Sequence, residues 1–203
     1  AQWQGRTVLT DEGKLVADDL AAGKAQPFPF KSLLLSDGPE GNQGAVAVLR
    51  KGDSTSGQAL VVKNSSQGMG HGHFDKLSWQ YYDNGHEIVS DYGAARFLNI
   101  EAKYGGRYLP ENESWGKQTV AHNTLVVDQQ SHFGGDAKAA NKLAPEQLYF
   151  SDKPGSQIST AKMTGAYQNV DFTRTLALLE LDGLSHPLVA DVMRVEGAGR
   201  HQY

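Results

Sequence analysis

The sequence predicts an all-β protein, an antiparallel β-sandwich preceded by one short N-terminal helix. Glycine makes up 23 of the 203 residues, against an average of ~7%, which favours short strands joined by many turns. β-favouring runs recur between residues 45 and 196 and are separated by turn-forming residues, a pattern typical of stacked antiparallel sheets. Two of these runs flank Asn84-Gly85, a hairpin dipeptide in which both residues accept a positive φ at low cost.

The helix is predicted over residues 10–22. Thr10 or Asp11 can act as the N-cap, and Gly23 follows as a stop signal. Apolar residues recur between these limits at helical spacing: Leu15, Val16 and Leu20. Pro27 and Pro29 follow in a segment that cannot continue a helix, so we expect a linker and a domain boundary within residues 24–43.

Nine strands are predicted after this linker. The hairpin around Asn84-Gly85 should place Trp79 and Tyr81 on one face and Tyr82 on the other, with most aromatic side chains, Tyr92 included, packed between the sheets. The stretch 131–148 is polar and Ala-rich, and we expect a loop or one helical turn there. The predicted strands are 45–50, 58–64, 77–83, 86–93, 122–128, 149–152, 157–165, 172–182 and 188–196.

Composition and motifs exclude several classes of protein. The net charge is -4 and no basic cluster is dense enough to neutralise a run of phosphates, so nucleic acid is not an expected partner. The mean hydropathy is -0.48, and no apolar run approaches the ~20 residues of a membrane-spanning helix. The chain has no cysteine, so a metal would have to bind through His, carboxylate or carbonyl groups. Serine-hydrolase and nucleotide-binding motifs are absent from the sequence.

The most informative segment for chemistry contains His71 and His73. Residues i and i+2 of an extended chain point to the same side, so both imidazoles can face one site. Asp91 ends the second strand of the hairpin, and His122 opens the next β-favouring run. Zinc accepts imidazole and carboxylate ligands, so His73, Asp91 and His122 form a candidate site with two imidazoles and one carboxylate.

Other interpretations of these residues stay open on spacing alone. A His-x-His pair is more often a surface or turn pair, and Asp91 could simply end a strand. Asp75 could cap a turn, or it could accept a hydrogen bond that fixes a histidine tautomer. The remaining histidines in polar surroundings are expected to be solvated: His86, His132, His186 and His201.

A Gly/Pro-rich loop near Arg107 and Tyr108 is a second candidate for function, because exposed loops often carry binding residues. Arg107 or Lys103 could contact the carboxylate of an acidic sugar, while Tyr108 stacks on the sugar or donates a hydrogen bond. An Arg-Tyr pair that merely covers a sheet edge fits the same residues.

Two stretches together resemble a known family. GHGHFDKLSWQYYDNGHEIVSDYGAARF (70–97) and GGRYLPENESWGKQTVAHNTLVVD (105–128) resemble the heparinase II/III-type β-sandwich part of polysaccharide lyases, and most closely the oligoalginate lyases. The resemblance implies that residues 1–43 are the tail of a helical toroid with a linker. It also implies that residues 44–203 are the β-sandwich, expected to be truncated at its C-terminus.

The resemblance also implies roles for individual residues. It implies a structural zinc ion held by His73, Asp91 and His122. It places His71 in the substrate cleft as a base or as a group that neutralises the substrate carboxylate. Tyr108, with Arg107 beside it, would bind substrate in the same cleft.

The activity implied is β-elimination at a uronic acid, on alginate oligosaccharides in the periplasm or outside the cell. The family's catalytic Tyr and its Asn-His pair belong to the N-terminal toroid, so this chain alone is expected to lack a complete active site. A homodimer is compatible with the sequence. Three alternatives remain: a heparin- or heparan-type lyase, a non-catalytic sugar-binding or scaffolding sandwich, and a cupin-like iron enzyme.

Overall fold

The computed structural model describes residues 2–3, 6–7, 10–24, 29–54, 56–66, 72–91 and 110–203. Within these residues one antiparallel sheet of nine strands has the order β12-β11-β10-β9-β4-β5-β6-β7, with β3 paired to β4. The strands are β3 (Leu33–Asp37), β4 (Gln43–Lys51), β5 (Gln58–Lys63), β6 (Trp79–Asp83), β7 (His86–Val89), β9 (Glu146–Lys153), β10 (Ser156–Tyr167), β11 (Val170–Leu179) and β12 (Leu188–Gly197).

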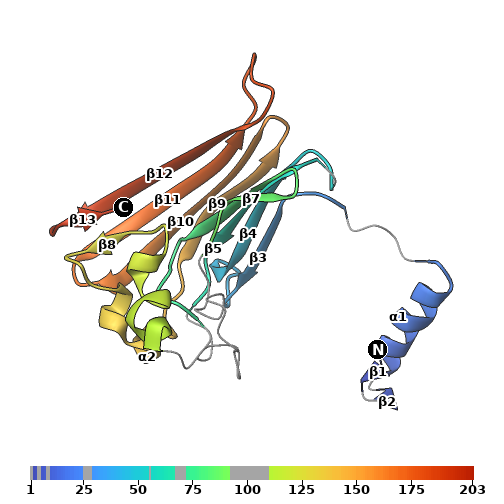
Figure 1. The fold of residues 1–203 in the computed structure, drawn as a ribbon, viewed down its shortest axis with the longest axis horizontal. Helices are drawn as coiled ribbons and strands as arrows, with labels where there is room; N and C mark the ends of the chain where they lie inside the picture. The colour runs from blue at the N-terminus through green and yellow to red at the C-terminus, as the bar shows by residue number, and fades with distance from the viewer. Residues whose placement is uncertain are drawn as a thin grey trace.

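The sheet is folded into two layers that face each other (Figure 1). Strands β3 to β7 form one layer and β9 to β12 the other, and β4 and β9 are joined by the single pair Gln43 and Glu146. One core cluster joins β4, β5 and β6 to β11, with Leu49 and Leu60 from the first layer and Leu176 and Leu178 from the second. The predicted antiparallel β-sandwich is therefore confirmed.

Short elements complete the fold. Two two-stranded sheets pair β1 with β2 and β13 with β8, and the described helices lie at the N-terminus and between β7 and β9. None of these helices has both the length and the apolar character needed to cross a bilayer. The short elements are β1 (Gln2–Trp3), β2 (Arg6–Thr7), α1 (Asp11–Ala21), η3 (Asn112–Gly116), η4 (Thr119–Ala121), β8 (Val126–Val127), η5 (His132–Gly135), α2 (Ala137–Ala140) and β13 (His201–Gln202).

The N-terminal helix is confirmed as α1. The Thr10 side chain accepts a hydrogen bond from the Gly13 amide at 3.2 Å, so this threonine is the N-cap. No residue of α1 is buried.

The structure corrects the predicted linker at its C-terminal end. Leu33–Asp37 form β3 and pair with β4, whereas residues 24–43 were expected to be linker. Three consecutive leucines at 33–35 form a short apolar run of the kind found in strands, although prolines lie close on both sides. The sandwich thus includes residues before 44, and position 44 lies inside β4.

The predicted strands 77–83 and 122–128 are wrong over their first residues, and the predicted strands 86–93 and 172–182 extend past the ends of β7 and β11. Leu77 has a φ of 61°, which breaks the extended chain, so β6 begins at Trp79. Residues 122–125 do not join a ladder, and only Val126–Val127 form a strand there. The predicted helical turn within 131–148 is confirmed by α2, but β9 begins at Glu146, earlier than expected.

Candidate metal centre

Three side chains from separate segments converge beside the first layer. His73 precedes β6, Asp91 follows β7, and His122 follows η4. One ligand atom from each residue lies within 4.8 Å of the other two. The two imidazole centroids are 5.2 Å apart, and His122 Nδ1 lies 3.5 Å from Asp91 Oδ2. The structure therefore brings together the three residues that the sequence suggested as a metal site.

The burial of His122 tests whether this group fits a metal. Its side chain is 1% exposed, and neither ring nitrogen has a hydrogen-bond partner among the described residues. An unpaired buried polar atom costs roughly 1 to 3 kcal/mol. A cation bound between the three side chains would satisfy one of these nitrogens. Two imidazoles and one carboxylate, with a fourth position for water, form a donor set that zinc accepts, so the residues fit the ion.

The electrostatics of His73 favour the form that binds metal. Burial is the main cause that lowers the pKa of His73, and the nearby His122 and Lys63 lower it further, against the opposite effect of Asp75 and Asp91. A lowered pKa leaves the imidazole neutral at pH 7, and only neutral imidazole coordinates a metal ion.

Hydrogen bonds tie the segment before β6 to the segment around η4. The contacts join a side chain or amide of one segment to the backbone of the other, so the two candidate histidine ligands belong to chain segments that are bonded together. They are Phe74 N to Lys117 O at 2.8 Å, Thr119 Oγ1 to Phe74 O at 2.6 Å, Thr124 Oγ1 to Lys76 O at 2.6 Å, and the paired contacts of Asn123 with the Trp79 backbone at 3.0 and 2.8 Å.

A buried arginine from the second layer holds the same two segments. Arg174 in β11 donates from Nη1 to Leu77 O at 2.8 Å and to Asn123 O at 2.5 Å. Its other donors reach the Asp191 carboxylate at 2.8 and 2.6 Å. Arg174 was not among the residues predicted from the sequence. The pattern that could have revealed it is the alternation along the strand, because Arg174 shares the inward face with Phe172 and Leu176.

The other expected site residues divide into two groups. His71, Lys103, Arg107 and Tyr108 lie outside the described residues, as does Tyr92, so their roles stay predictions. Asp75 is described and is 2% exposed. Both of its oxygens accept hydrogen bonds from Lys63 Nζ, at 2.7 and 2.6 Å, so an ion pair replaces the predicted turn cap or histidine partner.

The prediction that four histidines are solvated holds for three of them. His86, His186 and His201 are exposed, but His132 is fully buried. Its Nδ1 accepts from the Lys76 amide at 3.3 Å, which leaves Nε2 to donate to Leu125 O at 3.1 Å. Burial lowers the pKa of His132 to about 3, so the ring is neutral. The polar sequence around it concealed a residue whose two nitrogens are satisfied internally.

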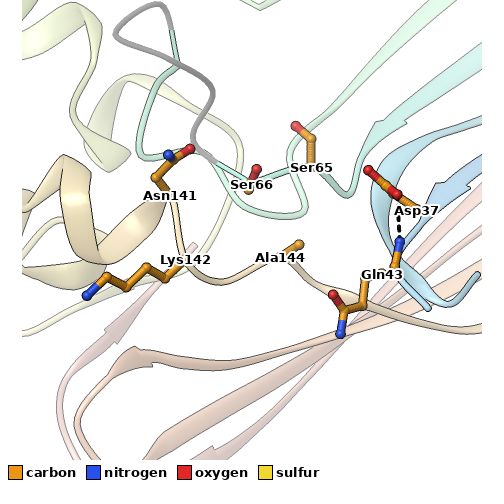
Figure 2. Close-up of a pocket in the computed structure, with 8 residues that line it drawn as sticks. Asp37, Gln43, Ser65, Ser66, Asn141, Lys142 and Ala144 are labelled. Atoms are coloured by element: carbon orange, nitrogen blue, oxygen red, sulfur yellow. Dashed lines mark hydrogen bonds between the residues drawn. The ribbon is translucent and has the colours of Figure 1, made fainter. Parts of the chain in front are cut away.

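A separate polar pocket lies between the β3–β4 turn, the chain after β5 and the chain after α2 (Figure 2). Asp37 at one side accepts a hydrogen bond from the Gly38 amide at 2.7 Å, and the Lys142 side chain extends away from the other labelled residues. Ser65 and Ser66 also line it. None of the three candidate ligands is among the residues that line it.

Comparisons with known proteins give the family of the chain. The family described as "Heparinase II/III-like, C-terminal" matches residues 34–203. An exo-oligoalginate lyase from Saccharophagus degradans is 54% identical over 195 residues, which cover 96% of this chain and 26% of that protein. An alginate lyase from Stenotrophomonas maltophilia is 54% identical over 203 residues, which cover 100% of this chain and 27% of that protein. The chain thus spans about a quarter of the length of these relatives.

Solved structures support the fold. The heparan sulfate lyase HepC from Pedobacter heparinus matches with a TM-score of 0.58 at 18% identity, over 84% of this chain and 26% of that one. A heparinase III, the BT4657 gene product, matches with a TM-score of 0.56 at 21% identity, over 82% of this chain and 23% of that one. The family expected from the His-x-His and His-Asn-Thr-Leu motifs is confirmed, and the chain belongs to the heparinase II/III-like C-terminal family.

Proposed function

We propose that this chain is the β-sandwich part of a polysaccharide lyase that cleaves uronic-acid glycans, specifically alginate oligosaccharides, by β-elimination. The observation that carries the proposal is the 54% identity, over nearly the whole chain, to two proteins named as alginate lyases. The solved structures named as heparan lyases are less than 25% identical and support the fold only. We therefore propose alginate, and not heparan, as the substrate.

The proposed role of the metal centre is structural. His73, Asp91 and His122 would hold a zinc ion that ties together the segments before β6, after β7 and after η4. The nitrogens of buried His122, which have no hydrogen-bond partner in the part of the chain that the structure describes, and the lowered pKa of His73 support this assignment. The described sheet ends at the edges β7 and β12, so it is not the closed barrel of the cupin-like iron alternative.

The proposed chemistry assigns complementary tasks to His71, Arg107 and Tyr108. Removal of the proton α to a uronate carboxylate requires that the developing enolate charge be stabilised by positive charge or hydrogen bonds. Arg107 would contact that carboxylate, and His71 would neutralise it or take the proton. Tyr108 would bind the sugar ring. The remaining acid-base groups are expected on a helical toroid of the intact protein.

Further parts of the proposal concern the product and the compartment. β-Elimination leaves a 4-deoxy unsaturated uronate at the new non-reducing end. Exolytic action on short oligomers is proposed from the name of the first relative. A periplasmic or secreted location is proposed because a polymer such as alginate is degraded outside the cytoplasm.

The test is an absorbance assay for the unsaturated product with the intact protein. Oligoalginate should give rising absorbance, heparin-like chains should not, and His71→Ala should abolish the rise. His86→Ala, at an exposed histidine, is the matched control and should retain activity. A rise only with heparin-like chains would overturn the choice of substrate. Binding without any rise would overturn the lyase assignment and favour the scaffolding alternative.

A further inference from the structure

A cluster of charges lies where β5 ends and the chain returns toward β6. Lys63, the last residue of β5, forms an ion pair with Asp75 through both carboxylate oxygens, at 2.6 and 2.7 Å. The neighbouring Lys76 is fully buried, and its Nζ donates to Ser65 O at 3.0 Å. Both contacts join residues 63–65 to residues 75–76. We call these contacts the Lys63–Asp75 clamp, because they join the end of β5 to the residues that follow His73.

Backbone hydrogen bonds extend the Lys63–Asp75 clamp toward β6. The Lys63 amide donates to Ser78 O at 2.8 Å, and the Leu77 amide donates to Lys63 O at 3.0 Å. Phe74 is held from the other side, where its amide donates to Lys117 O at 2.8 Å. His73 is therefore the residue directly before a stretch whose backbone is fixed on both sides. Its position relative to His122 depends on that stretch.

Burial of Asp75 makes the ion pair costly to break when Lys63 is the partner that is removed. The Asp75 side chain is 3% exposed and that of Lys63 is 29% exposed, so removing Lys63 would leave a buried carboxylate without its cation. Burial also lowers the pKa of Lys76 to about 8, against the opposite effect of Asp75. The cost of desolvating these charges offsets most of what they add to stability. Their role is therefore better explained by the fixed geometry that they impose.

We infer that Lys63 and Asp75 are positioning residues that hold His73 in coordinating geometry with Asp91 and His122. The inference rests on the proposed zinc site and goes beyond it, because neither residue is a ligand. The pair acts through its geometry and not through its net charge, which is zero. Loss of a group that hydrogen-bonds a metal ligand directly weakens metal binding by about 10- to 100-fold, and we expect a pair that acts through the backbone to reach the lower end of that range.

The experiment compares variants of the intact protein by zinc affinity and by the spectrum of the cobalt-substituted site. Lys63→Met combined with Asp75→Asn removes the pair without changing the net charge of the protein. Lys63→Arg keeps the ion pair. The control is Lys162→Met combined with Asp171→Asn, which removes a more exposed ion pair of 3.0 Å between β10 and β11. Thermal unfolding of the metal-free variants measures any general loss of stability.

The expected result is a zinc Kd at least about tenfold higher in the first double variant, with an altered cobalt spectrum. Lys63→Arg and the control pair should retain wild-type affinity and spectrum. Wild-type affinity and spectrum in the first double variant would overturn the inference while leaving the zinc site intact. Absence of zinc binding by the wild-type protein would overturn the proposed site and the inference with it.

Discussion

The side-chain amide of Asn123 takes the place of a neighbouring strand for Trp79. Its Nδ2 donates to Trp79 O at 2.8 Å, and its Oδ1 accepts from the Trp79 amide at 3.0 Å. One side chain thus satisfies both backbone groups of a strand residue. His122, the adjacent residue, is thereby fixed close to the start of β6.

Replacement of Asn123 by alanine should therefore destabilise the fold. Asn123→Ala leaves both backbone groups of partly buried Trp79 without these partners, and we expect a loss of about 1 to 3 kcal/mol in the free energy of unfolding. Chemical denaturation measures it. Gln80→Ala removes only a 3.4 Å exposed contact with Glu87 and should cost less than about 0.5 kcal/mol. Equal stability of the two variants would contradict the assigned role of Asn123.

Zinc should stabilise the protein through the candidate centre. At a free zinc concentration about 100 times the Kd, we expect a gain of about 2.7 kcal/mol over the chelator-treated protein. His122→Ala should abolish that gain, because it removes a ligand at the centre of the group. His86→Ala should leave the gain unchanged. Thermal unfolding with and without chelator measures the difference, and a zinc effect that survives in His122→Ala would place the ion elsewhere.

Arg174 should be one of the most sensitive positions in the core. Burial alone would raise the pKa of Asp191, but hydrogen bonds from Arg174 and Tyr203 outweigh it and hold the pKa below its ordinary value. Arg174→Met leaves that carboxylate without its cation and removes the donors to two backbone carbonyls. We expect a loss of about 3 to 5 kcal/mol by chemical denaturation.

The control for Arg174 is an arginine in an exposed ion pair. Arg194 pairs with Glu196 on β12, with side chains 77% and 53% exposed. Arg194→Met should change the free energy of unfolding by less than about 0.5 kcal/mol. A similar loss in both variants would mean that burial of Arg174 does not determine its contribution.

His132 should make the protein sensitive to acid. Its pKa is about 3 in the folded chain against an ordinary 6.5, so below pH 6.5 the unfolded state binds a proton that the folded state does not. The contribution of His132 is fully present above pH 6.5 and is lost as pH falls toward 3, by up to about 1.4 kcal/mol per pH unit.

Chemical denaturation between pH 7 and pH 4, with chelator present, measures this dependence. His132→Gln keeps an amide able to accept and donate but cannot titrate, so its free energy of unfolding should fall less steeply with decreasing pH. His86→Gln, at an exposed position, should keep the wild-type slope. An unchanged slope in His132→Gln would show that another group accounts for the acid sensitivity.

Local signals were sufficient for much of the fold. The Asn84-Gly85 turn, the Thr10 N-cap and the alternating runs of β10 and β11 depend on backbone preferences and on side-chain periodicity, which are written in neighbouring residues. The candidate ligand set was also visible, because His73 lies in a distinctive His-x-His motif and His122 opens the His-Asn-Thr-Leu run. The structure adds that the donor atoms of these two residues and Asp91 lie within 4.8 Å of one another.

What only the tertiary structure decided are the contacts between residues far apart in the chain. Arg174 donates a hydrogen bond to Leu77 O, 97 positions away in the chain. His132 can be buried because Lys76 and Leu125 satisfy its two nitrogens. Likewise Asn123 lies in a segment predicted to be a strand, but its side chain bonds the Trp79 backbone instead of its backbone joining a sheet. Burial and hydrogen-bond partners depend on which segments the two layers bring together, and the local pattern around a polar residue contains no record of that partner.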